Sequence, residues 1–183
     1  MPIELILGGA RSGKSRFAEN RVKALASQAS KPRTRHYVAT SEALDDEMVS
    51  RIKHHKLQRG EGWKEWECPC DLVSQLDRFD SADVVLIDCL TLWLNNVIYH
   101  QGASCSNQSL EQEIERLVVA LQQCSAHVIL VSNEVGMGVV PMGAVSRLFV
   151  DNAGRMNQAL ARIAQQVVLV AAGLPLTLKP ESE

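Results

Sequence analysis

The sequence lacks any hydrophobic run that approaches the roughly 20 residues of a membrane-spanning helix. Its first residues are apolar, with no basic leader and no cleavage site, which predicts a strand rather than a signal peptide. An excess of basic residues is also missing, because 19 Lys and Arg stand against 21 Asp and Glu, for a net charge of -2. Proteins that grip a nucleic-acid backbone normally carry a strong positive excess. We therefore expect a soluble protein with no membrane span and no nucleic-acid partner.

The five cysteines have no paired CxxC spacing. Cys68 and Cys70, with a proline between them, are the one close pair, and a metal or redox site there is the alternative to two inert cysteines. The odd number and the irregular spacing indicate neither a disulfide framework nor a zinc site. This pattern favours a reducing, cytoplasmic location.

The composition is that of an ordinary globular protein, with 46% apolar and 22% charged residues in 183. That length suits a single domain, so residues 1–183 are expected to form one nucleotide-binding unit around one core. Short runs of Val, Ile and Leu alternate with helical segments, which is typical of a parallel sheet covered by helices. Strands are expected at residues 3–7, 36–40, 84–88, 127–132 and 167–171, with 174–179 as a terminal hairpin partner and 63–68 as a short extra strand.

Apolar residues at steps of three and four predict the helices. One stripe joins Leu110, Ile114, Leu117 and Leu121, and Ser109 with Gln112 three positions later suggests a capping box at its start. Two polar segments rich in turn formers, at residues 30–35 and 102–108, are expected to be surface loops. The other expected helices span residues 14–27, 45–57, 90–99 and 144–165.

Residues 8–15 read GGARSGKS and satisfy the complete P-loop pattern G-x-x-x-x-G-K-[ST]. The glycines let successive backbone N–H groups surround a phosphate, and the helix that follows presents its positive end to the same anion. Lys14 supplies a mobile charge for the outer phosphates, and Ser15 supplies a hydroxyl ligand for Mg²⁺. The alternative is a chance match in a glycine-rich loop, and the predicted strand before the loop and helix after it argue against that alternative.

A second oxygen ligand is expected from Asp88, which ends the buried run of residues 84–88. P-loop enzymes hold their metal with a carboxylate in this position. The alternative is that Asp88 caps the helix that begins near Leu90, because Asp favours that position. The fold class expected from these features is α/β, a P-loop NTPase with a RecA-like, mostly parallel sheet flanked by helices.

A pair of histidines lies in the predicted helix at residues 45–57. Met48, Ile52 and His55 are spaced by four and three residues and share one face, whereas His54 points about 100° away. A neutral imidazole can attack phosphorus and carry a covalent phosphoryl or nucleotidyl group. His55 is the better candidate of the two, although an inward-facing histidine is also an ordinary core residue.

Five segments in order along the chain resemble one enzyme family, the bifunctional adenosylcobinamide kinase/adenosylcobinamide-phosphate guanylyltransferase of cobalamin biosynthesis. Many enzymes share a P-loop, but RIKHHK and SNEVGMGVVP are much more specific. The segments are GGARSGKSR at 8–16, VATSEALDDEM at 38–48, RIKHHK at 51–56, SNEVGMGVVP at 132–141 and AGRMNQALA at 153–161.

The resemblance implies two successive reactions. ATP or GTP first phosphorylates the aminopropanol hydroxyl of adenosylcobinamide. GMP from GTP is then transferred to adenosylcobinamide phosphate through a guanylylated histidine, which gives adenosylcobinamide-GDP and pyrophosphate. The family's nucleophile corresponds to His55, with Lys14 as the second catalytic residue, and family members resemble homotrimers.

The same matching implies GTP, ATP and Mg²⁺ as cofactors, with Ser15 and Asp88 as metal ligands. Close relatives can carry Glu in place of Asp88, which has the same charge and a longer reach. The nucleotide contacts implied are Gly8, Gly9, Ala10, Arg11, Ser12, Gly13, Lys14, Ser15, Thr40, Ser41, Glu42, Lys56, Leu57, Gln58, Arg59, Glu67 and Asp88.

Some positions keep two interpretations. Glu67 follows a Trp-rich segment and is either a nucleotide contact or an exposed strand residue. Asn133 and Glu134 follow a strand that should end at the site, because ligands gather at the carboxyl ends of parallel strands, but the matching gives them no role. A P-loop kinase of another small metabolite, with a structural His55, is the alternative function. A RecA-like motor is a further one, and the missing basic stripe counts against it.

Overall fold

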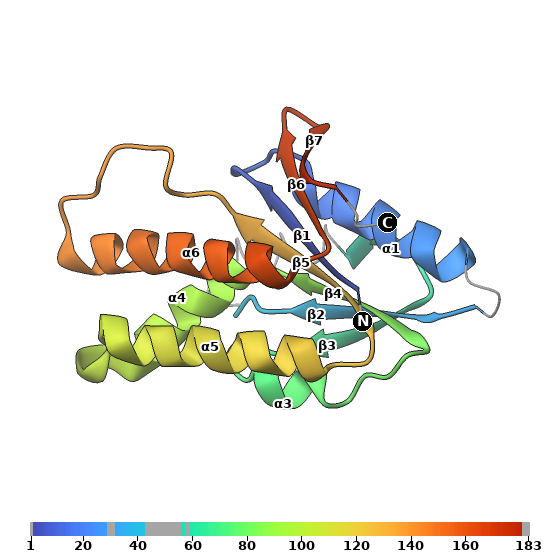
Figure 1. The fold of residues 1–183 in the computed structure, drawn as a ribbon, viewed down its shortest axis with the longest axis horizontal. Coiled ribbons are helices and arrows are strands. Elements are labelled where there is room, and N and C mark those ends of the chain that lie inside the picture. The colour runs from blue at the N-terminus through green and yellow to red at the C-terminus, as the bar shows by residue number, and fades with distance from the viewer. Residues whose placement is uncertain (1, 29–31, 43–55, 58, 181–183) are drawn as a thin grey trace.

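The computed structural model describes residues 2–28, 32–42, 56–57 and 59–180, and within them a seven-stranded sheet forms the centre of the fold. The strand order is β3-β2-β4-β5-β1-β6-β7 (Figure 1). All neighbours pair in parallel except β7, which runs antiparallel to β6. The strands are β1 (Ile3–Gly8), β2 (Thr34–Ala39), β3 (Trp63–Glu67), β4 (Asp83–Asp88), β5 (His127–Asn133), β6 (Gln166–Ala171) and β7 (Leu174–Lys179).

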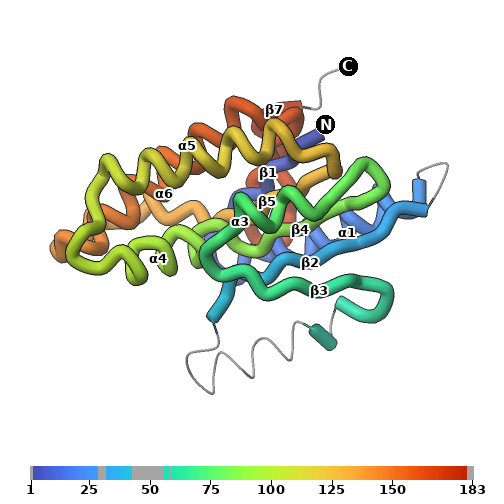
Figure 2. The backbone as a smooth tube through the Cα atoms, turned by 90° about the horizontal axis from the view of Figure 1, so that it is seen from below, coloured from blue at the N-terminus to red at the C-terminus, as the bar shows by residue number. Residues whose placement is uncertain are grey.

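The described helices cover both faces of the sheet, as the view in Figure 2 shows. Helix α1 packs on one face, mainly against β4 and β5, while α4 and α6 contact the other face and α5 packs on α6. The helices are α1 (Lys14–Gln28), α3 (Leu72–Leu76), α4 (Leu90–Gln101), α5 (Asn107–Gln123) and α6 (Ala144–Ile163), with a 3₁₀ turn η1 (Gly102–Ser104) between α4 and α5.

Alternation along the strands explains the two-layered core. In β1, Ile3, Leu5 and Leu7 belong to the cluster shared with α3 to α6, whereas Ile6 belongs to the cluster beneath α1. Successive side chains of a strand point to opposite faces, so a strand covered on both faces is mostly apolar, and in β1 the buried Glu4 is the exception. The buried strand β1 therefore lies inside the sheet between β5 and β6, and residue 9 follows at the carboxyl edge of the sheet.

The expected strands are all present, with ends that differ by one or two residues, and the antiparallel hairpin partner at 174–179 is confirmed. The five-residue α3 was missed, because so short a segment has no helical period to detect. The prediction of a loop at residues 102–108 was wrong, because this segment contains η1 and the start of α5. The helix expected at 45–57 lies outside the described residues except at its end, where residues 56 and 57 are helical.

The predicted capping box of α5 was also wrong. Helix α5 begins three residues before the expected position, at Asn107, and its N-cap is Ser106. The Ser106 hydroxyl accepts from the Ser109 backbone N–H at 3.1 Å, and the Ser106 N–H donates to the Ser109 hydroxyl at 3.0 Å. Ser109 therefore has the N3 role, not the N-cap role. In the part of the chain that the structure describes, none of the helices combines the length and apolarity needed to cross a membrane.

Candidate functional site

The P-loop connects the end of β1 to the first turn of α1. Arg11 and Gly13 adopt positive φ angles of 54° and 95°, which bend the loop back over the helix N-terminus. The buried Lys14 turns its Nζ onto the Gly9 carbonyl oxygen at 3.1 Å. The buried Ser12 hydroxyl has no hydrogen-bond partner among the described residues. A polar cradle with an unsatisfied hydroxyl and a folded-back ammonium is suited to an anion that replaces these internal contacts.

Neighbouring strands hold this loop in place. The Gly173 N–H, in the β6–β7 turn, donates to the Ser12 carbonyl at 2.8 Å, and the Glu134 N–H, just after β5, donates to the Gly8 carbonyl at 3.1 Å. A Cβ added to Gly8 would lie 2.6 Å from the Val170 carbonyl oxygen and would also collide with the Ser12 hydroxyl. The first glycine of the motif is therefore required by packing as well as by phosphate access.

Asp88 ends β4, and one strand, β5, separates it from β1. The Tyr37 hydroxyl donates to Asp88 Oδ2 at 3.5 Å. The N-cap of α4 is Cys89 and makes no side-chain capping bond, so the interpretation of Asp88 as a helix cap is wrong. Ser15 and Asp88 are both half-buried and offer a hydroxyl and a carboxylate, which are the hard oxygen donors that Mg²⁺ prefers.

A buried charged cluster lies beside Asp88, and sequence reasoning found only part of it. The Arg59 guanidinium carbon lies 3.3 Å from the centroid of the Tyr37 ring, and only 2% of Arg59 is exposed. Its Nε and Nη1 have no hydrogen-bond partner among the described residues. Burial raises the pKa of Glu19, on α1, against the opposing effect of Arg59, and the Asp88 charge raises it further. Glu19 and Tyr37 were missed because nothing in their local sequence marks them.

The expected contacts near the histidine pair are placed only in part. Lys56 Nζ lies 2.8 Å from Glu65 Oε2, and Arg59 Nη2 lies 3.3 Å from Glu65 Oε1, so Glu65 on β3 holds both cations. Leu57 is 82% exposed, and Glu67 is exposed at the end of β3. His55 and Gln58 lie outside the described residues.

Thr40 follows β2 and is fully buried. Its hydroxyl donates to the Cys89 carbonyl at 2.7 Å and accepts from the Cys89 N–H at 2.9 Å. These two bonds fix the carboxyl ends of β2 and β4 side by side. Ser41 and Glu42, which follow, are half-buried and lie at that same edge of the sheet.

Comparison with known proteins supports this arrangement of motifs. Residues 4–178 match the family described as "Cobinamide kinase / cobinamide phosphate guanyltransferase". The chain belongs to this family. Membership confirms the predicted P-loop α/β fold and the resemblance seen in the five segments, and it makes the protein a kinase and guanylyltransferase. Family membership argues against the alternative of a RecA-like motor, and it favours two activities over the alternative of a single kinase activity.

Three curated relatives cover almost the whole chain. The chain is 43% identical over 180 residues to the bifunctional adenosylcobalamin biosynthesis protein CobP of Pseudomonas aeruginosa, with 97% of this chain and 98% of that protein aligned. It is 40% identical over 187 residues to the protein CobU of Escherichia coli and 41% identical over 189 residues to CobU of Salmonella typhimurium. Both alignments cover 96% of this chain and 98% of the relative.

Two of the family segments meet at the end of β5. The Ser132 hydroxyl donates to Asn157 Oδ1 at 2.7 Å, and Asn157 Nδ2 donates to the Asn133 carbonyl at 3.4 Å. Asn133 Nδ2 in turn donates to the Thr91 hydroxyl at 2.9 Å, which ties β5 to α4. Asn133 therefore orders the carboxyl edge of the sheet, a role that the spacing of its motif did not reveal.

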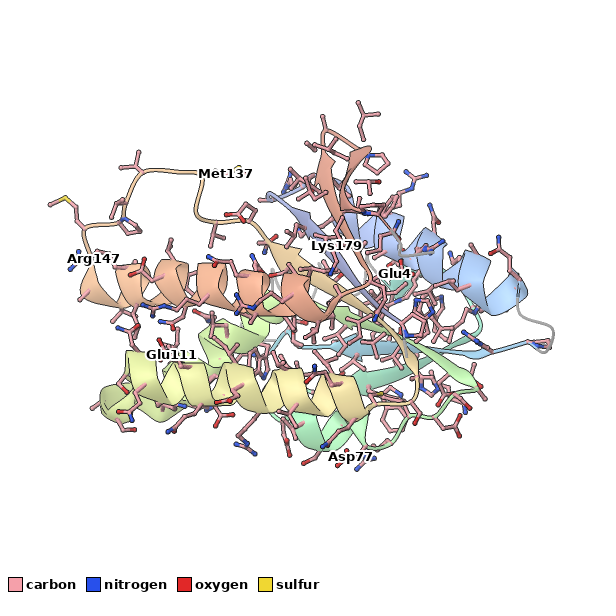
Figure 3. The ribbon with its side chains drawn as sticks, viewed as in Figure 1. Glu4, Asp77, Glu111, Met137, Arg147 and Lys179 are labelled. Carbon is pink, nitrogen blue, oxygen red and sulfur yellow. The ribbon has the colours of Figure 1, made fainter. Side chains whose placement is uncertain are left out.

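The remainder of the SNEVGMGVVP segment forms a loop that rises above α6. Figure 3 shows Met137 on this loop and Arg147 near the start of α6. Between the loop and the helix lies a hollow of about 290 Å³, whose polar lining includes Arg147, Asp151 and Arg155. The segments SNEVGMGVVP and AGRMNQALA therefore both line this hollow, one from the loop and one from α6.

Proposed function

We propose that this protein catalyses two successive steps of adenosylcobalamin biosynthesis on one P-loop domain formed by residues 1–183. In the first step it phosphorylates adenosylcobinamide with ATP or GTP. In the second step it transfers GMP from GTP to adenosylcobinamide phosphate and releases pyrophosphate. The observation that carries the proposal is the complete P-loop in a chain of this family, with Lys14 bonded to the Gly9 carbonyl and the Ser12 hydroxyl without a partner among the described residues.

In the kinase step, the oxygen of the aminopropanol hydroxyl attacks the γ-phosphorus of the nucleotide, the bond to the β–γ bridging oxygen breaks, and the hydroxyl proton is released to solvent. Lys14 is proposed to exchange its 3.1 Å bond to the Gly9 carbonyl for the transferred phosphoryl group. The backbone N–H groups of the loop and the positive end of α1 hold the remaining phosphates. Such a displacement needs positioning and charge neutralisation more than covalent help from the protein.

Mg²⁺ is proposed to bind through Ser15 and Asp88. When bound, it supplies positive charge that offsets the charge of the β- and γ-phosphates. The donor set supports this assignment, because the Ser15 hydroxyl lies in the first turn of α1, just beyond the carboxyl end of β1, and the Asp88 carboxylate ends β4. The ligands of parallel sheets gather at these strand ends. Tyr37 donates to one oxygen of Asp88 and would keep that carboxylate oriented.

Arg59 is proposed as a second cation that binds nucleotide phosphate. It lies shortly before β3, far from Lys14 in the sequence. Its guanidinium is pre-positioned by stacking on Tyr37, and two of its nitrogens, Nε and Nη1, have no partner among the described residues. A buried guanidinium with spare donors is suited to bidentate contact with a phosphate. The Glu65 carboxylate pairs with Arg59 Nη2 through one oxygen and with Lys56 Nζ through the other, so it lies between the two cations.

The guanylyl transfer is proposed to run through His55. Its imidazole nitrogen attacks the α-phosphorus of GTP, forming a P–N bond while the bond to pyrophosphate breaks. The phosphate oxygen of adenosylcobinamide phosphate then attacks the same phosphorus, and the P–N bond breaks to restore the histidine. Two displacements allow pyrophosphate to leave before the bulky corrinoid enters.

The remaining nucleotide contacts are proposed from the family matching. The buried hydroxyl of Thr40 is bonded to Cys89, so we assign the side-chain contacts of that segment to Ser41 and Glu42. The proposed set is Gly8, Gly9, Ala10, Arg11, Ser12, Gly13, Lys14, Ser15, Thr40, Ser41, Glu42, Lys56, Leu57, Gln58, Arg59, Glu67 and Asp88.

The test is incubation of the protein with α-labelled GTP and Mg²⁺, comparing wild type with His55→Ala and His54→Ala. We expect label on the wild type that is labile in acid and stable in base, as a phosphorus–nitrogen bond is. His54→Ala is the matched control, because it removes the neighbouring imidazole. We expect His55→Ala to lose the label and His54→Ala to keep it.

The kinase step gives an independent measurement on the same variants. γ-labelled ATP should still phosphorylate adenosylcobinamide with His55→Ala, because His55 has no part in that displacement. Equal labelling of all three proteins by α-labelled GTP would overturn the histidine assignment. A wild-type protein that uses γ-label but never retains α-label would show a kinase without a guanylylated intermediate.

A further inference from the structure

Three side chains that can each donate a metal ligand lie together near the carboxyl ends of β2 and β3. A Glu42 carboxylate oxygen, the Cys70 sulfur and a His100 ring nitrogen all lie within 4.8 Å of one another. Glu42 Oε1 and His100 Nε2 are 3.0 Å apart. In the described part of the chain, this is the one such group of three. None of the P-loop residues and neither Ser15 nor Asp88 belongs to it.

The three residues come from three separate elements. Glu42 lies three residues beyond β2, Cys70 lies between β3 and α3, and His100 lies in the last turn of α4. Their separations of 28 and 30 residues in sequence explain why the cysteine spacing alone indicated no zinc site. Only the folding of the β2 and β3 edge against α4 brings them together.

Helix α4 positions the two loops before any ligand binds. Asn96 Nδ2 donates both to the Thr40 carbonyl at 2.8 Å and to the Pro69 carbonyl at 3.1 Å, so one buried amide holds the chain just before Glu42 and just before Cys70. The Trp93 indole N–H donates to the Cys70 carbonyl at 2.6 Å. Asn96 and His100 are four residues apart and share one helix face. The backbone that carries all three side chains is therefore fixed.

The donor set selects the class of ligand. Thiolate, imidazole and carboxylate together are typical ligands of Zn²⁺ and of metals with similar preferences, and they are poor ligands for Mg²⁺. Ligand atoms around tetrahedral zinc sit about 2.0–2.3 Å from the ion, so small side-chain rotations bring a spread of up to 4.8 Å into range. Three protein ligands leave a fourth position for water, and the half-exposed His100 side chain opens that position to solvent.

We propose that Glu42, Cys70 and His100 form a binding site for Zn²⁺ or a divalent metal of the same class, which shares Glu42 with the proposed nucleotide contacts and contains neither Ser15 nor Asp88. Binding releases one proton from the Cys70 thiol and leaves a metal-bound thiolate. The ion would tie the chain beyond β2 to the end of α4. This inference rests on the side-chain cluster and is independent of the proposed reactions.

Co²⁺ is the probe for the experiment, because thiolate coordination gives a near-ultraviolet charge-transfer band that Zn²⁺ then removes by displacement. We expect the band in the wild type at about one Co²⁺ per chain. Cys70→Ser should abolish it, and His100→Ala should weaken Co²⁺ binding by about tenfold or more. Cys105→Ser is the matched control, because Cys105 is also half-buried but lies between η1 and α5, and it should keep the band.

A second measurement separates binding from failure to fold. Zn²⁺ should raise the Tm of the wild type and of Cys105→Ser, and should leave the Tm of Cys70→Ser unchanged while that variant melts cooperatively. The proposal is overturned if the wild type shows no thiolate band, or if Cys70→Ser keeps the band. Equal loss of the band in Cys105→Ser would also overturn it.

Discussion

Glu4 is the second residue of β1 and is only 2% exposed, and its carboxylate has charged and polar partners on two sides. Arg21, on α1, donates to its two carboxylate oxygens at 2.8 and 3.0 Å. His127 Nε2, at the start of β5, donates to Oε1 at 2.8 Å. Burial by itself raises the pKa of Glu4, but the hydrogen bonds from His127 and Arg21 outweigh it, and its pKa lies below the ordinary value of 4.5. Figure 3 shows Glu4 inside the fold, well away from the loop that carries Met137.

Replacing Glu4 with Gln should lower the free energy of unfolding at pH 7 by about 2–4 kcal/mol, because Arg21 and the buried His127 lose a charged acceptor. Since the folded-state pKa is lowered, the stabilisation is complete above the unfolded value of 4.5 and is lost as the pH falls through the folded-state pKa. Urea unfolding of wild type and Glu4→Gln at several pH values measures both effects. The difference between the two proteins should therefore shrink in acid.

A surface pair provides the control for this prediction. Glu113 and Arg116 form an ion pair at 3.0 Å on the exposed side of α5. Glu113→Gln should change the free energy of unfolding by less than about 0.5 kcal/mol. An effect of Glu4→Gln as small as that of the control, or one independent of pH, would contradict the stabilising role of the buried carboxylate.

The sequence predicted those site residues whose chemistry is local. The P-loop could be read from eight consecutive residues, because its glycines, lysine and serine act within one turn of chain. Tyr37 and Glu19 could not be read in the same way, because they matter only through Asp88 and Arg59, which the folding of β2, β4 and α1 brings to them. The Glu42, Cys70 and His100 group is invisible in the sequence for the same reason.

At the scale of elements, helix boundaries depend on competition between equivalent local signals. Ser106 and Ser109 are each followed three residues later by a side chain able to complete a capping box, Ser109 and Gln112 respectively. Sequence spacing cannot choose between them. The structure chooses Ser106, and a further bond from the Ser109 hydroxyl to Gln101 Oε1 at 2.7 Å links the cap to the end of α4. Strand positions were easier to predict, because apolar runs buried on both faces leave few alternatives.

Removing the Ser106 hydroxyl should therefore destabilise the protein. We expect Ser106→Ala to lower the free energy of unfolding by about 1 kcal/mol, because the Ser109 N–H loses its acceptor at the helix start. Gln112→Ala is the matched control and should have almost no effect, since it lies beyond the cap. Thermal or urea unfolding of both variants measures the two effects. A larger loss of unfolding free energy in Gln112→Ala than in Ser106→Ala would support the capping box that starts at Ser109 instead.

At the scale of the whole molecule, most of the exposed large apolar side chains among the described residues lie on two segments. One is the loop between β5 and α6, where Met137, Val139 and Met142 are 80%, 95% and 95% exposed. The other is β7, whose Leu174, Leu176 and Leu178 are also exposed. Contiguous exposed apolar surface normally marks an interaction site. We propose these two surfaces as subunit interfaces of the homotrimer that the family resemblance implies.

We expect light scattering after size exclusion to give three times the 20.1 kDa mass of one chain. The double variant Val139→Asp, Met142→Asp should shift the protein toward single chains, because two charges replace apolar side chains in the proposed interface. A loss of about 3 kcal/mol would weaken association by about 100-fold. Val119→Asp, on the outer side of α5, is the control and should leave the mass unchanged. A wild-type protein with the mass of one chain, or a double variant that stays trimeric, would show that the loop between β5 and α6 is exposed for another purpose.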